Sequence, residues 1–153
     1  QEGSPLDLNR YPRTLFSAEF IGTNNFLAGV VREVGRRTVV ALDGSNTTVV
    51  ADRCPEDVCP GMAVWVCARA DDVDIIDEDQ RAKYDNVIQA TIERALLTGG
   101  TVIVQATVGG ARLRIHAGGS RRFGLLGREG TPVLCALGNV SLIPRRTEEA
   151  PQP

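Results

Sequence analysis

The stretch that decides the fold is FLAGVVREVGRRTVVALDGSNTTVVA, which runs from Phe26 to Ala51. It holds three runs of β-branched and apolar residues separated by short polar breaks, which is the pattern of consecutive strands. Asp43-Gly44 is a strong signal for a tight hairpin between the second run and the third. The predicted strands cover residues 26–34, 38–42 and 47–51.

Further strands follow toward the C-terminus, and their order repeats that of the first half. They are predicted at residues 61–68, from 73, and at 86–97, 102–108, 112–117, 131–137 and 140–143. Equivalent positions keep a nearly constant offset: Gly44 and Gly110 lie 66 positions apart, and Cys67 and Cys135 lie 68 apart. The sequence predicts an all-β fold of two repeats, at 25–80 and 81–146, forming two small barrels or one intertwined pair. Since each repeat alone buries only a thin core, we expect the two to pack together.

The two ends of the chain fall outside this repeat. Residues 15–21 form a short apolar stretch that predicts one or two helical turns, stopped by Gly22. Apolar side chains near Phe16 and Phe20 are expected to cover another domain. We expect residues 147–153 to be a disordered tail. A start at Gln1, with no secretory leader, suggests a piece of a longer protein.

Composition and single residues exclude several functions. The formal net charge of −2 argues against a general binder of polyanions. The only lysine, Lys83, lacks the glycines of a phosphate-binding loop, so this chain holds no nucleotide in that way. The only histidine, His116, lies on the polar face of a predicted strand, which favours a structural role over a catalytic one. No nucleophile–base pair is evident, and we expect no enzyme activity.

We expect neither a metal site nor a cofactor in this chain. Cys54 and Cys59 lack the second ligand pair of a structural zinc site, and Cys67 and Cys135 lie within apolar strands. Four reduced thiols are therefore expected. The acidic residues between Asp71 and Asp79 lack the spacing of a calcium loop and are interpreted as a solvated linker.

Residues 12–29, PRTLFSAEFIGTNNFLAG, resemble the junction at which the catalytic domain of bacterial ABC importer ATPases meets a C-terminal transport-associated OB (TOBE) domain. The stretch GMAVWVCAR at 61–69 is similar to a later strand of that family, with Arg69 at the start of its Arg-Pro-Glu motif. Ala70 and Asp71 replace the proline and glutamate of that motif. The resemblance points to ATPases of the polyamine, ferric-iron and phosphonate type.

This resemblance implies two OB-like barrels of the TOBE or MOP-like kind, preceded at 1–24 by the end of the ATPase core. It implies an accessory or regulatory domain that mediates contacts between two ATPase subunits, with membrane-spanning permease subunits as partners of the whole protein. ATP and Mg²⁺ would bind upstream, outside this chain. The implied location is cytoplasmic, peripheral on the inner face of the cell membrane, and a homodimer is expected.

A binding site for a small oxyanion is a further hypothesis from the residues, since arginine forks suit such ligands. The candidate residues are Arg112, Arg114, Arg121 and Arg122. The competing interpretation is a solvated strand face that balances the acidic segment. A stand-alone oxyanion carrier or sensor of the molybdate type is the alternative function. Binding of single-stranded nucleic acid is disfavoured, because the chain has too few aromatic residues outside apolar contexts for a stacking platform.

Overall fold

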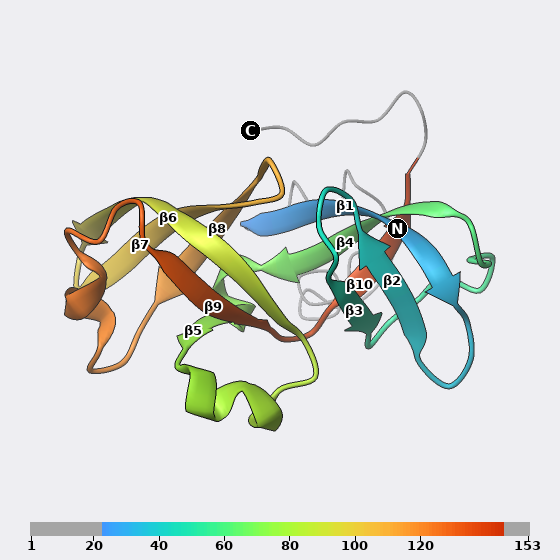
Figure 1. Cartoon of the computed structure of the whole chain (residues 1–153), viewed down its shortest axis with the longest axis horizontal. Coiled ribbons are helices and arrows are strands. Elements are labelled where there is room, and N and C mark those ends of the chain that lie inside the picture. The colour runs from blue at the N-terminus through green and yellow to red at the C-terminus, as the bar shows by residue number, and fades with distance from the viewer. Residues whose placement is uncertain (1–22, 146–153) are drawn as a thin grey trace. The chain divides into compact units, whose positions relative to one another are not determined.

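The computed structural model describes residues 23–145 and consists of ten strands with three short 3-10 helices (Figure 1). The predicted helix at 15–21 and the predicted tail at 147–153 lie outside the described residues. The strands are β1 (Asn24–Glu33), β2 (Thr38–Leu42), β3 (Thr48–Ala51), β4 (Ala63–Arg69), β5 (Val73–Ile76), β6 (Val87–Thr98), β7 (Thr101–Val108), β8 (Ala111–Ala117), β9 (Pro132–Leu137) and β10 (Ser141–Pro144). The 3-10 helices are η1 (Ala70–Asp72), η2 (Glu78–Lys83) and η3 (Arg122–Leu125).

The all-β prediction is confirmed, and the glycines stand at the predicted turns. Five glycines at these turns have a positive φ, a backbone angle that residues other than glycine rarely adopt. They are Gly44, Gly99, Gly100, Gly109 and Gly110. Strand β6 contains one irregularity, where its register with β7 shifts between Ile92 and Arg94. The residues of β6 before and after this shift both pair with β7, so β6 continues to Thr98 as one strand.

The first compact unit is a five-stranded sheet with the order β10-β4-β1-β2-β3. Antiparallel pairing joins all neighbours in this order. The residues after β3 then meet β10 in parallel at Arg53 and Ser141. Asp52 N–H donates to the Val140 carbonyl at 2.8 Å, and Leu142 N–H donates to the Arg53 carbonyl at 3.2 Å. These main-chain bonds close the sheet into a barrel.

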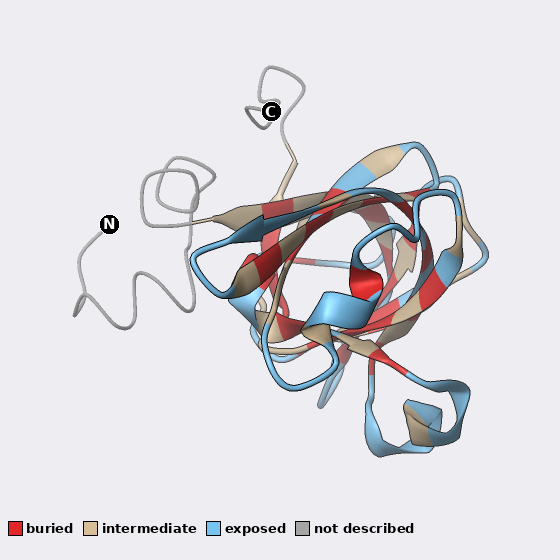
Figure 2. Cartoon of the chain, turned by 90° about the vertical axis from the view of Figure 1, so that its left-hand side faces the viewer, coloured by how far each residue is buried: buried red, intermediate tan, exposed pale blue. Residues whose placement is uncertain are grey.

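The second compact unit has the sheet order β5-β9-β6-β7-β8. Its two edge strands, β5 and β8, lie beside each other, so this sheet also closes on itself. Figure 2 looks into this ring and shows buried residues along the strands that form it. The interior is built from alternate residues of β7, since Val102, Val104, Ala106 and Val108 are buried and their neighbours are less so.

The compact units do not coincide with the sequence repeats at 25–80 and 81–146. One unit contains the described residues up to Arg69 and from Asn139, and the other contains residues 70–138. The reason is an exchange of strands: β5 of the first repeat pairs with β9, and β10 of the second repeat pairs with β4. Each compact unit therefore contains strands of both repeats, and its limits lie at residues 69/70 and 138/139 rather than at 80/81.

At Gly29, strands β1 and β2 of the first unit approach each other closely. It pairs with Leu42 of β2 on one side and with Val64 of β4 on the other. A Cβ atom at this position would lie 2.7 Å from Val40 Cγ1 and 2.8 Å from the Ala41 carbonyl oxygen. Because the second of these is a main-chain atom, the strand pair cannot accommodate a side chain here without shifting.

Cys67 and Cys135 are buried, as their apolar surroundings predicted, with 1% and 0% of their surfaces exposed. Burial raises the pKa of the Cys135 thiol to about 12 and raises the pKa of the Cys67 thiol further, because a thiolate loses its hydration there. The four cysteines are free thiols, and Cys59 is exposed. The two buried thiols thus behave as small hydrophobic side chains.

Substitution Gly29→Ala should lower the free energy of unfolding by about 1–3 kcal/mol, because the added methyl group overpacks β1 against β2. Gly35→Ala is the matched control, since nothing lies within 4 Å of a Cβ atom at Gly35. Urea unfolding of the two variants measures the difference. Equal midpoints for the two variants would contradict this close approach.

Stability should also fall above pH 9. The unfolded chain ionises Cys135 near its ordinary pKa of 9.0, whereas the folded chain keeps the thiol protonated up to about 12. The stabilising contribution is therefore complete below pH 9 and is lost as the pH rises through this window, at about 1.4 kcal/mol per pH unit. Unfolding measured between pH 8 and 11 should show a shallower pH dependence for Cys135→Ala than for the wild type. The same slope in both would refute the assignment.

Candidate functional site

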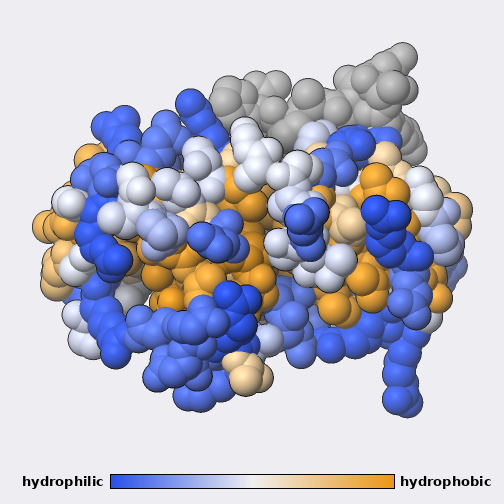
Figure 3. Space-filling model, viewed as in Figure 1, coloured by the Kyte–Doolittle hydropathy of each residue, from blue (hydrophilic) through white to orange (hydrophobic). Residues whose placement is uncertain are grey.

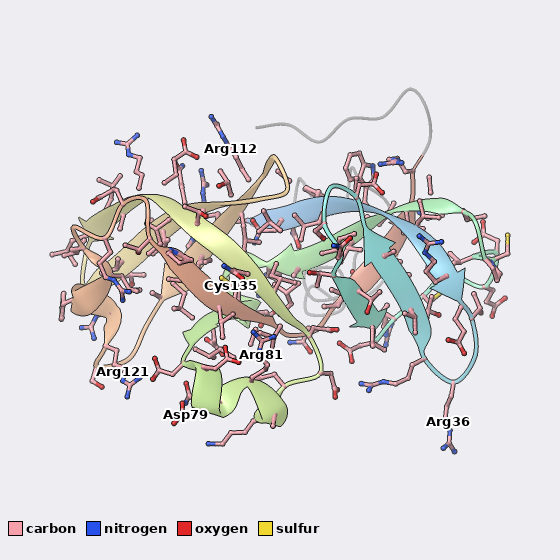
Figure 4. All side chains as sticks on the ribbon, viewed as in Figure 1. Arg36, Asp79, Arg81, Arg112, Arg121 and Cys135 are labelled. Atoms are coloured by element: carbon pink, nitrogen blue, oxygen red, sulfur yellow. The ribbon has the colours of Figure 1, made fainter. Side chains whose placement is uncertain are left out.

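Strand β8 carries two of the four candidate arginines on one face. Arg112 and Arg114 are exposed, while Leu113 and Ile115, which alternate with them, are buried in the second unit. Arg112 lies opposite Thr107 of β7, and Arg114 lies opposite Gln105. Figure 4 shows the Arg112 side chain extending away from the ribbon. The predicted alternation of polar and apolar residues along β8 is thus present. Its exposed side is a polar surface that carries two guanidinium groups.

Arg121 has a structural partner. Its guanidinium donates a hydrogen bond to the Asp77 carboxylate, which directly follows β5. This hydrogen bond and the charge of Asp77 raise the pKa of Arg121 above its ordinary value. In Figure 4, Arg112 and Arg121 lie at opposite margins of the second unit. Arg121 is therefore not part of the arginine face of β8.

Arg122 is held by main-chain groups. Its guanidinium donates to the carbonyl oxygens of Gly100 and Gly119, and it lies over the Phe123 ring at 4.2 Å from the ring centroid. These contacts fasten η3 to the turn between β6 and β7. The structure thus brings together Arg112 and Arg114, and it uses Arg121 and Arg122 to join segments of the fold.

His116 completes the polar face of β8 and also has a partner. Its Nδ1 atom lies 2.8 Å from Oδ1 of Asp71, which belongs to η1 immediately before β5. The imidazole is only partly exposed, at 26%. This contact joins the end of β8 to η1.

The pairs Asp71–His116 and Asp77–Arg121 were not predicted from the sequence. They flank β5 at its two ends and join it to β8 and to the residues that follow β8. The sequence separations, 45 and 44 residues, are almost equal, which is the signature of two segments running in parallel. The only sign of these pairs in the sequence is the presence of Asp71 and Asp77 on either side of a short strand. Their positions do not show which basic residues they contact.

The acidic segment from Asp71 to Asp79 is exposed over most of its length, and it contains β5 as well as the start of η2. No residue of η2 is buried, and Figure 3 shows a hydrophilic surface over this part of the molecule. Glu78 pairs with Arg81 at 2.9 Å. Within residues 23–145, no group of three or more His, Cys, Asp and Glu side chains is arranged to hold a metal ion.

None of the helices in the described part of the chain combines the length and the hydrophobicity needed to span a bilayer.

No family model matches the sequence. Among curated proteins, the chain is 35% identical over 101 residues to a Fe(3+) ions import ATP-binding protein of Rhizobium meliloti. It is 31% and 25% identical to spermidine/putrescine import ATP-binding proteins of Lawsonia intracellularis and Protochlamydia amoebophila, over 112 and 122 residues. These matches cover 61–79% of this chain. The chain spans only 24–33% of the length of those relatives.

Among solved structures, the chain is similar to the cytoplasmic molybdate-binding protein ModG, in a crystal form with molybdate bound. The TM-score is 0.63, and the match covers 77% of this chain and 94% of ModG. At 16% sequence identity the likeness concerns the fold alone. The two-unit, OB-like all-β architecture is thereby confirmed, and the sequence matches confirm the resemblance of this chain to the TOBE portion of bacterial ABC importer ATP-binding proteins.

Proposed function

We propose that this chain is the C-terminal accessory domain of an ATP-binding subunit in an ABC-type solute importer. The observation that carries the proposal is the extent of the sequence matches. Most of this chain aligns with import ATP-binding proteins, yet it covers only a quarter to a third of their length. A segment of this size, without a phosphate-binding loop, corresponds to the accessory portion rather than to the catalytic one.

In this role the chain performs no chemistry of its own. ATP and Mg²⁺ bind to an upstream catalytic domain, and the permease subunits are contacted through the whole protein at the cytoplasmic face of the membrane. The two barrels supply contacts between two ATPase subunits that persist while the catalytic domains open and close. A ligand or protein that favours one arrangement of these contacts shifts the equilibrium between open and closed states, and thereby regulates hydrolysis.

The gene provides a direct test of this proposal. The reading frame immediately upstream of Gln1 should encode a Gly-x4-Gly-Lys-Ser/Thr loop, and the purified 153-residue chain should not hydrolyse ATP. The matched comparison is the product of the complete reading frame, which should hydrolyse ATP in the presence of Mg²⁺. An upstream frame without the loop, or ATP hydrolysis by the 153-residue chain, would refute the proposal.

A second candidate function is oxyanion binding by a stand-alone protein. The observation that favours it is the likeness of fold to a molybdate-binding protein. Arg112 and Arg114 are the residues that supply charge for such a ligand, because they share the exposed face of β8. The remaining candidates, Arg121 and Arg122, already contact Asp77 and main-chain carbonyls.

Calorimetric titration with molybdate, sulfate and phosphate distinguishes the two functions. The accessory-domain proposal does not require oxyanion binding at the arginine face. The stand-alone function predicts saturable binding that Arg112→Ala/Arg114→Ala abolishes. Arg36→Ala is the matched control, because Arg36 is an exposed arginine of the other unit (Figure 4). Saturable oxyanion binding that Arg112→Ala/Arg114→Ala abolishes and Arg36→Ala retains would favour the stand-alone function over the accessory one.

A further inference from the structure

Strand β4 has an apolar face on each side. Val64, Val66 and Ala68 are buried in the interior of the first unit. Trp65 and Cys67 alternate with them and therefore point to the opposite, outer face. The register places Trp65 between Ala28 of β1 and Ile143 of β10, and it places Cys67 between Phe26 and Ser141.

This outer face is as well packed at its centre as a protein core. Cys67 and Ile143 are 1% and 3% exposed, and the partly buried rings of Phe26 and Trp65 pack against them. At one margin the Arg145 guanidinium lies 5.5 Å from the centre of the Trp65 ring and is tied to Asp43 at 3.3 Å. An antiparallel sheet with one buried face normally presents polar residues to water on the other face. The outer face of β10, β4 and β1 departs from this rule.

The polar atom on this face also lacks a partner within the described residues. Trp65 Nε1 is buried and makes no hydrogen bond there. A buried indole N–H usually finds an acceptor. The combination of a ring that is partly buried, a covered N–H group and apolar neighbours is typical of a surface that a further segment completes.

We propose that residues 15–21 of this chain, Leu-Phe-Ser-Ala-Glu-Phe-Ile, pack on the outer face formed by Phe26, Trp65, Cys67 and Ile143. The segment is apolar at five of its seven positions and ends three residues before β1 begins at Asn24. It supplies two phenylalanine rings at a spacing of four residues, and these rings would otherwise be exposed to water.

The reach of the chain supports this occupant over a second copy of the molecule. Asn24 pairs with Arg69, and Trp65 lies four residues along β4, which is about 13 Å away. Phe20 and Phe16 precede Asn24 by four and eight residues, so they reach about 14 Å and 28 Å from it when extended. Both rings therefore reach Trp65 within one chain. A tethered segment also acts at a high effective concentration, which an unlinked partner does not match.

In this arrangement residues 15–21 are held against the outer face of the first unit.

Trp65 is the only tryptophan of the chain, so its fluorescence reports on this face. In the 153-residue protein, Phe16→Asp/Phe20→Asp should shift the Trp65 emission to longer wavelength. Quenching by acrylamide should rise about twofold or more, because water and quencher then reach the ring. The conservative variant Phe16→Leu/Phe20→Leu should retain the wild-type emission and quenching. Phe123→Asp, at an exposed phenylalanine of the other unit, is the matched control and should change neither.

Alkylation of the cysteines separates loss of the cover from loss of the fold. In Phe16→Asp/Phe20→Asp, Cys67 should react faster with iodoacetamide, while Cys135 in the other unit stays protected and Cys59 reacts as in the wild type. Mass spectrometry of the labelled peptides measures the three rates. The inference is wrong if Trp65 quenching and Cys67 labelling are unchanged in this variant. It is equally wrong if the protection of Trp65 in the wild type decreases on dilution, since a second copy would then be the cover.

Discussion

The exchange of one strand between the two repeats is the constraint on which the rest of the fold depends. Each five-stranded sheet takes its completing strand from the other repeat, β5 beside β9 and β10 beside β4. Without β10, strand β4 would be an exposed edge with unpaired main-chain groups. Neither repeat can therefore satisfy its own hydrogen bonds, and the two compact units form only when both repeats are present.

The two barrels are closed by different interactions. In the first unit, main-chain hydrogen bonds join residues 52 and 53 to Val140 and Leu142. In the second unit, side-chain bonds cross the closure, Asp71 with His116 and Asp77 with Arg121. The side-chain closure of the second unit explains why the four arginines predicted to form one anion site are separated in the structure. Arg121 helps to close the barrel, Arg122 fastens η3, and the exposed face of β8 retains Arg112 and Arg114.

The residues that carry chemistry in many proteins are used here for structure. The single lysine stands in η2 without the glycines of a nucleotide loop, and the single histidine is engaged by Asp71. Two of the four thiols are buried and protonated. The surface that remains, a polar strand face on one unit and an apolar outer face on the other, is suited to contacts with other protein segments. The chain is similar to ATP-binding proteins of importers over 24–33% of their length.

The sequence by itself determined the strands, their turns and the repeat, because alternation, positive-φ glycines and hairpin signals act between neighbouring residues. It also identified Cys67 and Cys135 as core residues and Arg112 and Arg114 as a shared face. Only the tertiary structure decided the exchange of β5 and β10, the partners of Asp71 and Asp77, and the second apolar face of β4. These features join residues tens of positions apart, and a local pattern shows which side chains need a partner but not which distant segment provides it.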